Sequence, residues 1–321
     1  MDLAIVRAVL PSFSIAFLGY IYSRIDKKLD VKTITNLIYY VFSPCLVFSS
    51  LVNRKFEFQE LFLLGGAVII LISMMMLITF LYMKATAVRE NGFYLPIIFM
   101  NTGNIALPMA LFLYGNEGLG KAVLFHLVNV VFLYSMGVLL VSNKADFKQV
   151  FKIPFLYAAI LGVLIATVPI PIPSCSVECF NLIGKGISIL GEGSVPLLII
   201  SLGYSLNRTR MADLKHGLAG AGLRVLIGPA IAFGIVILFR HLGWLSMDPG
   251  QDPVHYEDLR KTEATIILMA AMPAPIVSFL LNEKFESCPE KAASMVLAGT
   301  LAGIVTIPLV LMLSHRFIFG R

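Results

Sequence analysis

Apolar runs of about 20 residues recur along almost the whole chain, separated by short polar connections. A bilayer core about 30 Å thick is crossed by about 20 helical residues. Lipid offers the backbone no hydrogen-bond partners, so each such run is expected to be a helix. The sequence therefore predicts an all-α integral membrane protein with ten transmembrane helices. Hydropathy assigns them to residues 3–22, 33–52, 61–83, 93–114, 119–141, 153–170, 186–206, 217–240, 262–281 and 292–315.

The composition leaves no room for a soluble domain beside these spans. Hydrophobic residues make up 58% of the 321 residues and charged residues 14%, whereas about 45–50% of a soluble domain is apolar. The first run has no basic segment before it and is followed by Arg24, Lys27 and Lys28 instead of a small-residue cleavage site. We therefore expect it to be a retained span and not a signal peptide.

Lys and Arg are more numerous on the connections after spans 1, 3, 5, 7 and 9 than on the other connections and the termini. Because these residues concentrate on the cytoplasmic side, the bias predicts a multi-pass protein of the cell membrane with both termini outside. The formal net charge of +6 reflects loop Lys and Arg. It does not indicate a nucleic-acid partner.

The cysteines and short motifs give no sign of a metal site or an enzyme. Cys45, Cys175, Cys179 and Cys288 form no paired CxxC clusters and have no nearby His ligands, so zinc is not expected. Cys175 and Cys179 are close enough for a disulfide if their loop faces an oxidising side, with free thiols as the alternative. The chain contains no HExxH, GxSxG or P-loop motif. We therefore expect neither catalysis nor a cofactor.

The two halves of the chain, residues 1–150 and 151–321, resemble each other. "SPCLVFSSL" in span 2 and "VPLLIISLG" in span 7 put Pro44 in register with Pro196, an offset of 152. Each half holds five spans, an odd number, so the second repeat enters the membrane inverted relative to the first. This pattern predicts an inverted 5+5 repeat.

Spans 4 and 9 carry the interruptions of this repeat. "YGNEG" and "LNEKF" align Asn116 with Asn282 at an offset of 166, which carries Pro108 to Ala274, between two prolines. Inverted repeats with paired Pro or Gly interruptions are typical of secondary transporters, whose binding site lies at the bilayer midplane. The sequence therefore predicts that the broken spans 4 and 9 form the site.

The stretch "FMNTGNIALPMAL" (residues 99–111) places polar residues, a Gly and a Pro in the middle of span 4. Pro108 cannot donate a backbone hydrogen bond and clashes with the carbonyl of Asn104, while Gly103 loosens the same turn. Freed backbone groups in a membrane are tolerated only around a cavity. A polar pocket is therefore expected at this point.

Asn101, Thr102 and Asn104 are the expected lining of that pocket, because carboxamides both donate and accept hydrogen bonds. A half-helix that begins near Leu107 would point its N-terminal amides into the same space. The arrangement suits a carboxylate. The alternative is that these side chains only bond neighbouring helices.

Span 9 offers "AAMPAPIVSF", where Pro273 and Pro275 interrupt the helix. Its small alanines allow helices to cross closely. Ser278 is the one side-chain ligand candidate here, and a hydroxyl bond back to its own helix is the alternative. We expect most of the polar contacts to come from span 4.

Ionisable residues within spans are functional candidates, because charge is expensive in a membrane. Glu192 lies in span 7 and Arg224 in span 8. They could form a structural ion pair or anchor their helices, or Glu192 could carry a proton. His126 in span 5 could titrate or be a structural histidine.

Four motifs resemble the auxin efflux carrier family, within the larger group that includes sodium-coupled bile acid symporters. "NTGNIALPMALFLYG" is similar to the family's Asn-Thr-Gly-x-x-Gly-x-Pro-Leu crossover, with Ala106 where Gly is usual. "GLRVLIGPA" resembles the Arg-Phe-Leu-x-Gly-Pro-Ala stretch of plant carriers. "LGEGSVPLLIISLG" places Glu192 at the family's acidic position, and "AAMPAPIVSF" resembles the second crossover. The resemblance covers nearly the whole chain.

This resemblance implies ten helices in an inverted 5+5 repeat, with broken helices 4 and 9 crossing. It also implies a scaffold of spans 1, 2, 6 and 7, a transport domain of spans 3–5 and 8–10, an elevator-like mechanism and often a homodimer. The long hydrophilic loop of plant carriers is missing at residues 142–152. We therefore expect a compact prokaryotic-type member.

The implied substrates are small organic carboxylates, namely indole-3-acetate in plant carriers and malate or malonate in prokaryotic ones. The second crossover here lacks the Asn of prokaryotic members. Glu263 lies at the end of span 9, with no other acid near the crossovers, which disfavours the sodium coupling of the bile acid type. Two alternatives stay open, a sodium-coupled symporter of organic anions and a membrane sensor that binds the same ligand without moving it.

Overall fold

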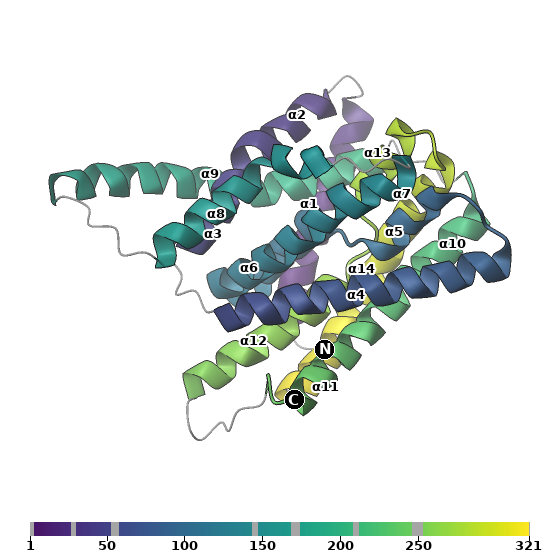
Figure 1. Ribbon diagram of the computed structural model, residues 1–321. Helices are drawn as coiled ribbons and strands as arrows, with labels where there is room; N and C mark the ends of the chain where they lie inside the picture. The colour runs from purple at the N-terminus through teal and green to yellow at the C-terminus, as the bar shows by residue number, and fades with distance from the viewer. Residues whose placement is uncertain are drawn as a thin grey trace.

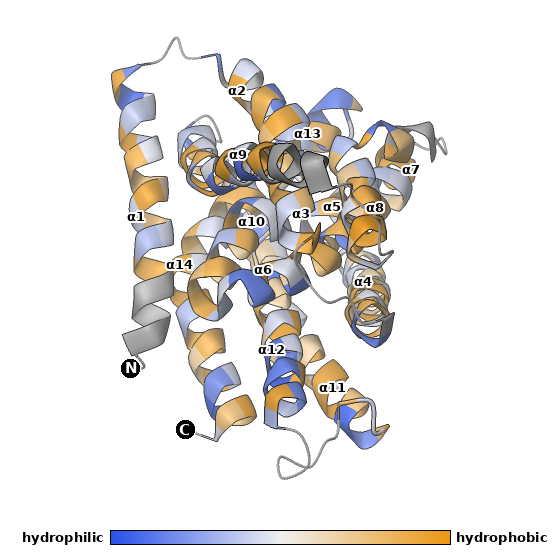
Figure 2. Cartoon of the chain, turned by 90° about the vertical axis from the view of Figure 1, so that its left-hand side faces the viewer, coloured by the Kyte–Doolittle hydropathy of each residue, from blue (hydrophilic) through white to orange (hydrophobic). Residues whose placement is uncertain are grey.

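The computed structural model describes residues 3–26, 30–52, 58–142, 147–167, 174–207, 212–245 and 253–320. These residues form helices and no strands, which confirms the all-α prediction. Figures 1 and 2 show that α1 begins and α14 ends on the same side of the molecule. Within the described part, six helical runs are long and apolar enough to cross a membrane, beside two shorter apolar helices. The count of ten spans stays a prediction.

Helices of the first half follow the apolar runs, with short π-helical turns inside three of them. Gly115 divides α6 into two parts, since its φ of 65° lies in the left-handed region that glycine adopts without steric cost. The expected spans 93–114 and 119–141 meet there. The elements are α1 (Leu3–Ile25), α2 (Val31–Leu37), η1 (Ile38–Phe42), α3 (Ser43–Val52), α4 (Phe58–Thr86), η2 (Asn91–Phe93), α5 (Tyr94–Ile98), η3 (Thr102–Ala106), α6 (Leu107–Phe132), η4 (Leu133–Gly137) and α7 (Val138–Ser142).

The α-helices described in the second half are on average longer than those in the first half. The expected span 262–281 is divided by the irregular residues 271–275. Asp213 caps the N-terminus of α10, because its carboxylate accepts a hydrogen bond from the backbone N–H of His216. The elements are η5 (Phe147–Lys152), α8 (Pro154–Thr167), α9 (Ser174–Leu206), α10 (Leu214–Gly222), η6 (Leu223–Ile227), α11 (Gly228–His241), α12 (Pro253–Ala270), α13 (Ile276–Lys284) and α14 (Pro289–Phe319).

Contacts between helices fall into two sets. In the first set, α1 packs against α9, and α3 packs against both α8 and α9. In the second, α14 packs against α10, α12 and α13, and α4 packs against α6 and α11. The two sets meet where α1 contacts α6 and α14, and also where α3 and α9 approach α6 and η3. The irregular segments of the chain lie near this meeting.

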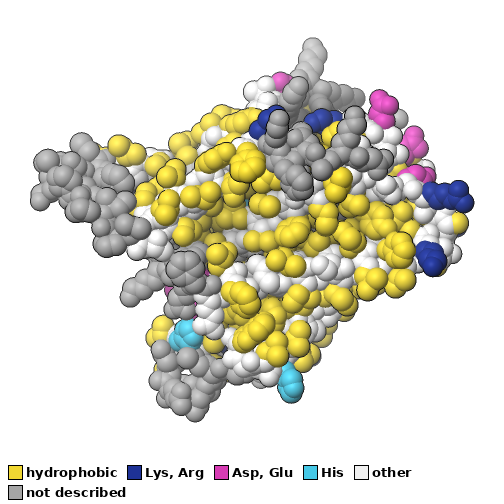
Figure 3. Space-filling view, viewed as in Figure 1, with side chains coloured by type: hydrophobic (Ala, Val, Ile, Leu, Met, Phe, Trp, Pro, Cys, Tyr) yellow, Lys and Arg dark blue, Asp and Glu magenta, His cyan; other side chains and the backbone are white. Residues whose placement is uncertain are grey.

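Large apolar side chains face outward as well as inward. Phe62, Leu161 and Leu313 each expose more than half of their surface. Figure 3 shows hydrophobic side chains spread across the middle of one face, with the charged ones gathered toward its margins, and Figure 2 shows the same apolar character along many helices. An apolar surface this extensive is what a lipid environment requires of a protein.

Candidate crossover site

Two helical interruptions touch each other in the interior. Residues 99–101 separate α5 from η3, and residues 271–275 separate α12 from α13. The backbone N–H of Asn101 donates to the carbonyl of Pro273, with an N···O distance of 2.8 Å. Backbone groups that neither helix can satisfy are thus partly satisfied by the other break, as a membrane interior demands.

The first break lies earlier than the sequence predicted. Pro108 stands in the first turn of α6, seven residues beyond Asn101. The π-helical turn η3 precedes it, and its last bond runs from the N–H of Leu107 to the carbonyl of Thr102, five residues back. Because a π turn shifts the bonding by one residue, it accommodates a proline without opening the helix. The half-helix therefore begins at Thr102 and not near Leu107, which corrects that expectation.

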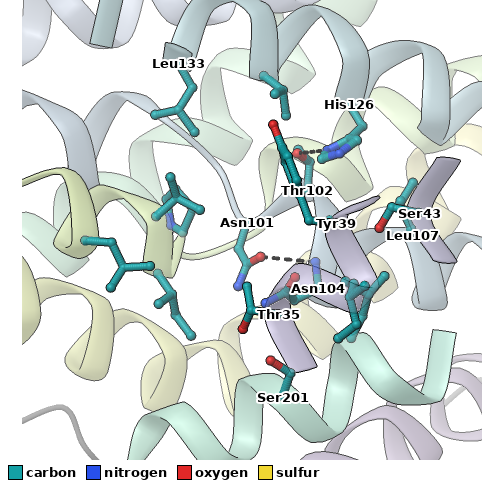
Figure 4. Close-up of a pocket in the computed structure, with 18 of the residues that line it drawn as sticks. Thr35, Tyr39, Ser43, Asn101, Thr102, Asn104, Leu107, His126, Leu133 and Ser201 are labelled. Atoms are coloured by element: carbon teal, nitrogen blue, oxygen red, sulfur yellow. Dashed lines mark hydrogen bonds between the residues drawn. The ribbon is translucent and has the colours of Figure 1, made fainter. Parts of the chain in front are cut away.

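A cavity of about 620 Å³ opens at the crossover (Figure 4). Its walls come from α2, η1, α3, α8 and α9 on one side and from η3, α6, η4 and α13 on the other. Most of the lining side chains are apolar, and the polar ones cluster at the first break. They include Thr35, Asn36, Tyr39, Ser43, Asn101, Thr102, Asn104, His126, Asn129, Tyr134, Ser201, Ser205 and Lys284.

Asn101 has one half of its carboxamide bound and the other half open. Its Oδ1 accepts a hydrogen bond from the backbone N–H of Asn104 at 3.2 Å, which caps the new half-helix. Its Nδ2 is buried and has no hydrogen-bond partner among the described residues. Figure 4 shows Asn101 and Asn104 amid the lining residues. A buried donor left open is costly, so this position favours a ligand or water that accepts a hydrogen bond.

Thr102 joins the break to the following helix. Its Oγ1 lies 2.7 Å from Nδ1 of His126 and accepts a hydrogen bond of 3.1 Å from Nδ2 of Asn129. Asn129 Nδ2 also donates to the carbonyl of Met100 at 3.4 Å. The Oδ1 of Asn129 is buried without a partner among the described residues. Asn129 therefore offers the cavity an acceptor, beside the donor of Asn101.

Gly103 leaves room for the histidine of this group. A Cβ built on Gly103 would lie 3.3 Å from Cε1 of His126, so a larger residue would press on the imidazole. The His126 ring also lies near the ring of Phe155 on α8, with centroids 5.5 Å apart. His126 thus sits between the break and the opposite wall of the cavity.

The second break contributes less polar chemistry to the cavity. Pro275 lines it, whereas Pro273 takes part through its backbone carbonyl. Ser278 is fully buried, and its hydroxyl donates to the carbonyl of Pro275 at 2.6 Å. Neither Ser278 nor Pro108 is among the lining residues. The bond of Ser278 to its own helix is the alternative that the sequence left open.

Glu192 and Arg224 do not form the ion pair considered from the sequence. Glu192 is exposed on α9, where it accepts a hydrogen bond from Ser188. Arg224 is fully buried and donates to the backbone carbonyls of Ile97, Ile98 and Ala270. The two charges belong to different sets of helices, which hydropathy could not show.

The sequence did not point to nine of the thirteen polar lining residues, among them Asn129 and Lys284. Asn129 follows His126 by three residues, so helical periodicity could have brought it to the same face. Lys284, at the end of α13, is the only Lys, Arg, Asp or Glu among the described lining residues. Hydropathy placed it on the connection after residues 262–281, so it looked like an ordinary loop charge.

Metal ligands do not gather in the described part of the chain, where no group of three His, Cys, Asp or Glu side chains is found. Glu263 is held by Arg240 through two hydrogen bonds of 2.5 Å. Cys45 and Cys288 are free thiols. The question of a disulfide between Cys175 and Cys179 falls on side chains outside those described.

Comparison with known proteins agrees with this architecture. The family described as membrane transport protein matches residues 4–152 and 138–311. An uncharacterized transporter of Methanothermobacter thermautotrophicus is 25% identical over 320 residues, covering 94% of this chain and 96% of that protein. An uncharacterized transporter of Methanocaldococcus jannaschii is 23% identical over 328 residues, covering 96% and 97%. This chain is therefore a multi-pass membrane protein that belongs to the membrane transport protein family, the family of the auxin efflux carriers.

Proposed function

We propose that this protein is a carrier, not an enzyme, that moves a small organic carboxylate across the cell membrane by alternating access. The observation that carries the proposal is the open Nδ2 donor of Asn101, buried at the crossover and lining the cavity. A carboxylate is the strongest acceptor that a metabolite brings to such a donor. Malate, malonate and an auxin-like indole acid are the candidate substrates.

The charge distribution favours an anion. The half-helix that starts at Thr102 presents the positive end of its dipole at the break. Lys284 adds a full positive charge to the lining, and no Asp or Glu is among the described lining residues. A bound carboxylate would therefore meet only positive and neutral groups.

The volume and the apolar walls of the cavity indicate the size and polarity of the part of the substrate that lies beyond its carboxylate. At about 620 Å³ the cavity is of the size that small-molecule sites have. Phe155, Leu133 and Leu198 contribute apolar surface to the lining. An indole acid would use this surface, whereas malate or malonate would leave it to water. Both kinds of acid belong in the first screen.

The packing supports the proposed inverted repeat. In a 5+5 arrangement α1 corresponds to α8, and α2 to α3 together correspond to α9. The contact of α1 with α9 then has the contact of α8 with α3 as its counterpart, and both contacts are present. Leu46 and Leu198, which the offset of 152 pairs, both line the cavity. We therefore propose ten spans, with residues 1–150 and 151–321 as the two repeats.

The place of the cavity supports an elevator-type movement. One wall comes from α2, η1, α3, α8 and α9, which belong with α1 to the proposed scaffold, and the other comes from the proposed transport domain. Sliding one set of helices past the other would carry Asn101 and its ligand from one side of the membrane to the other. The breaks would travel together, because Asn101 is bonded to Pro273.

The alternative mechanism is coupling of transport to sodium, as in the bile acid symporters. The nearest acid on α12, Glu263, is already neutralised by Arg240. Glu60 and Asp258 are likewise already engaged, since both form an ion pair with Lys121. We therefore propose sodium-independent transport, and exchange that stops when sodium is replaced by choline would contradict it.

A ligand screen followed by an exchange assay tests the function. Thermal stabilisation of the purified protein is measured with malate, malonate and indole-3-acetate, each beside its amide analogue. The acids are expected to raise the melting temperature and the amides are not, because ligands that bind the folded state stabilise it. Counterflow of the radiolabelled acid into proteoliposomes then separates a carrier from a sensor, since a sensor binds without exchange. If none of the acids raises the melting temperature, the proposal is contradicted.

Orientation and assembly are further parts of the proposal. We place both termini outside the cell membrane and propose a homodimer, as is frequent in the family. A single cysteine added after Arg321 should react with a membrane-impermeant maleimide on intact cells. Light scattering of the detergent complex should give twice the mass of the chain. Protection of that cysteine or a monomeric mass would correct these two points.

A further inference from the structure

The two broken helices direct their C-terminal ends toward one point. α5 ends at Ile98 and α12 ends at Ala270, and both ends are buried. The last carbonyl groups of a helix lack partners inside that helix, and together they carry a negative partial charge. Two such ends in a membrane interior concentrate negative potential where water cannot screen it.

Arg224, on the π-helical turn η6, places a positive charge against this negative potential. Its side chain is fully buried. Nη1 donates to the carbonyls of Ile97 and Ile98 at 3.4 and 3.3 Å, and Nη2 donates to the carbonyl of Ala270 at 2.5 Å. One guanidinium therefore bonds the ends of both half-helices, one from each half of the chain.

The chain makes room for this guanidinium at one specific position. A Cβ on Gly228 would come within 2.1 Å of Nη2 of Arg224 and within 3.1 Å of the carbonyl oxygen of Ala270. A residue larger than glycine would displace the guanidinium from α12. Gly228 and Arg224 lie one turn apart across η6, so the sequence "RVLIG" specifies both the charge and its space.

The charge of Arg224 has no carboxylate partner in the described part of the chain. Arg240, by contrast, forms an ion pair with Glu263. In transporters with broken helices, unwound carbonyls and half-helix C-terminal ends are the groups that coordinate a coupling cation such as sodium. In this protein a side chain of fixed positive charge occupies that position.

We infer that Arg224 takes the place of a coupling cation at the crossover, holding α5 and α12 together and making the carrier independent of external cations. The dependence of transport on cations rests on the proposed carrier function, whereas the bond between the two helix ends does not. Arg224 is a positioning residue, because it contacts helix ends and does not line the cavity.

Arg224→Ala tests the inference, with guanidinium added back as the probe. The variant should melt at a lower temperature than the wild type and regain part of the difference in millimolar guanidinium chloride, far below the concentrations that unfold proteins. Choline chloride at the same concentration should have no effect. Arg316→Ala, which removes an exposed guanidinium from the last turn of α14, is the matched control and should not respond to either salt.

Transport is the second readout, measured as counterflow of radiolabelled malate or indole-3-acetate. Exchange by Arg224→Ala should fall about tenfold or more, as the loss of hydrogen bonds from a charged group implies. Guanidinium, and more weakly sodium, should restore part of it, while the wild type stays indifferent to both. Arg224→Lys keeps the positive charge but loses the planar, forked guanidinium donors. It should therefore exchange substrate independently of added cations, at a reduced rate. This variant replaces Arg224→Ala in the assay if the alanine variant does not fold.

The two readouts separate the two proposals. Suppose that the wild type moves none of the acids but guanidinium restores the melting temperature of Arg224→Ala. The carrier function would then be contradicted, whereas the role of Arg224 as the cation at the crossover would stand. Wild-type stability and exchange in Arg224→Ala without added cation would overturn the inference. Exchange by the wild type that requires sodium would overturn it as well.

Discussion

Asn101 and Asn282 are two buried carboxamides, one in each half of the chain, and their surroundings differ. Asn282 is fully buried, and its Nδ2 donates to the carbonyls of Gly92 and Ser278 at 3.1 and 2.8 Å. Its Oδ1 accepts from the backbone N–H of Cys288 at 3.2 Å. In the side chain of Asn101, only Oδ1 forms a hydrogen bond within the protein, whereas Nδ2, at the cavity, has no partner among the described residues.

Under the proposed function, this difference separates a structural residue from a binding residue of the same type. Hydrogen bonds that are complete within the protein stabilise the fold and offer nothing to a ligand. A buried donor that stays open destabilises the empty protein, so we expect a ligand or an ordered water to accept a hydrogen bond from it. Under the proposed function, the polar binding contacts belong to the first break, and the second break supplies rigidity and apolar wall.

The largest expected effect is that of Asn101→Ala on transport. The variant loses the donor to the substrate carboxylate, so counterflow should fall by about 10- to 100-fold, the equivalent of one hydrogen bond to a charged group. Asn101→Asp is the matched control, because it keeps the cap on Asn104 but replaces the donor with a repelling charge. It should transport as poorly as the alanine variant although the cap is kept, which separates loss of the donor from loss of the cap. Wild-type exchange in both variants would remove Asn101 from the site.

Asn282→Ala should lower the stability of the protein, whereas Asn101→Ala should lower its transport rate. Removing the carboxamide leaves the buried groups of Gly92, Ser278 and Cys288 without their partner, which costs about 2–3 kcal/mol. The melting temperature in detergent should fall by several degrees, whereas the remaining folded protein should bind malate or indole-3-acetate with unchanged affinity. A lost affinity with an unchanged melting temperature would reverse the assignment of the two residues.

Asp213→Asn extends the comparison to a second capping residue with no role in the cavity. Asp213 accepts a bond from the N–H of His216 at 3.1 Å, and this bond lowers the pKa of the carboxyl below its ordinary value of 3.8. A lowered pKa means stability that is present above pH 3.8 and is lost as the pH falls through the folded-state pKa.

Asn caps a helix about as well as Asp, so the variant should lose only the contribution of the negative charge at the helix N-terminus, about 0.3–1 kcal/mol near pH 6. The gap in melting temperature should narrow as the pH is lowered from 5 toward 3. A gap that widens with acid would show that the carboxylate does not supply the stabilisation.

Ser278→Ala should have the smallest effect of the four. Its hydroxyl bonds the carbonyl of Pro275 in its own helix and does not line the cavity. The free energy of unfolding should change by less than about 1 kcal/mol, and exchange should stay within twofold of the wild type. A tenfold loss of exchange would mean that the second break also grips the substrate.

The sequence predicted much of this site at the level of segments. The cluster from Asn101 to Asn104 was identified because polar residues in a long apolar run are rare and costly, and all four line the cavity. The position of the break was wrong, because a π turn absorbs Pro108, and hydropathy carries no information on hydrogen-bond register. Asn129 was missed because a single Asn in a span is common.

The sequence by itself determined that the chain is helical and lies in a membrane, because lipid satisfies no backbone group and every apolar run must satisfy its own. Only the tertiary structure decided which polar atoms stay open and which charges find partners. Asn129 meets Thr102 from 27 residues away, and Arg224 meets Ile98 from 126 residues away. Such bonds depend on how distant helices cross, and a local pattern of residues does not specify that crossing.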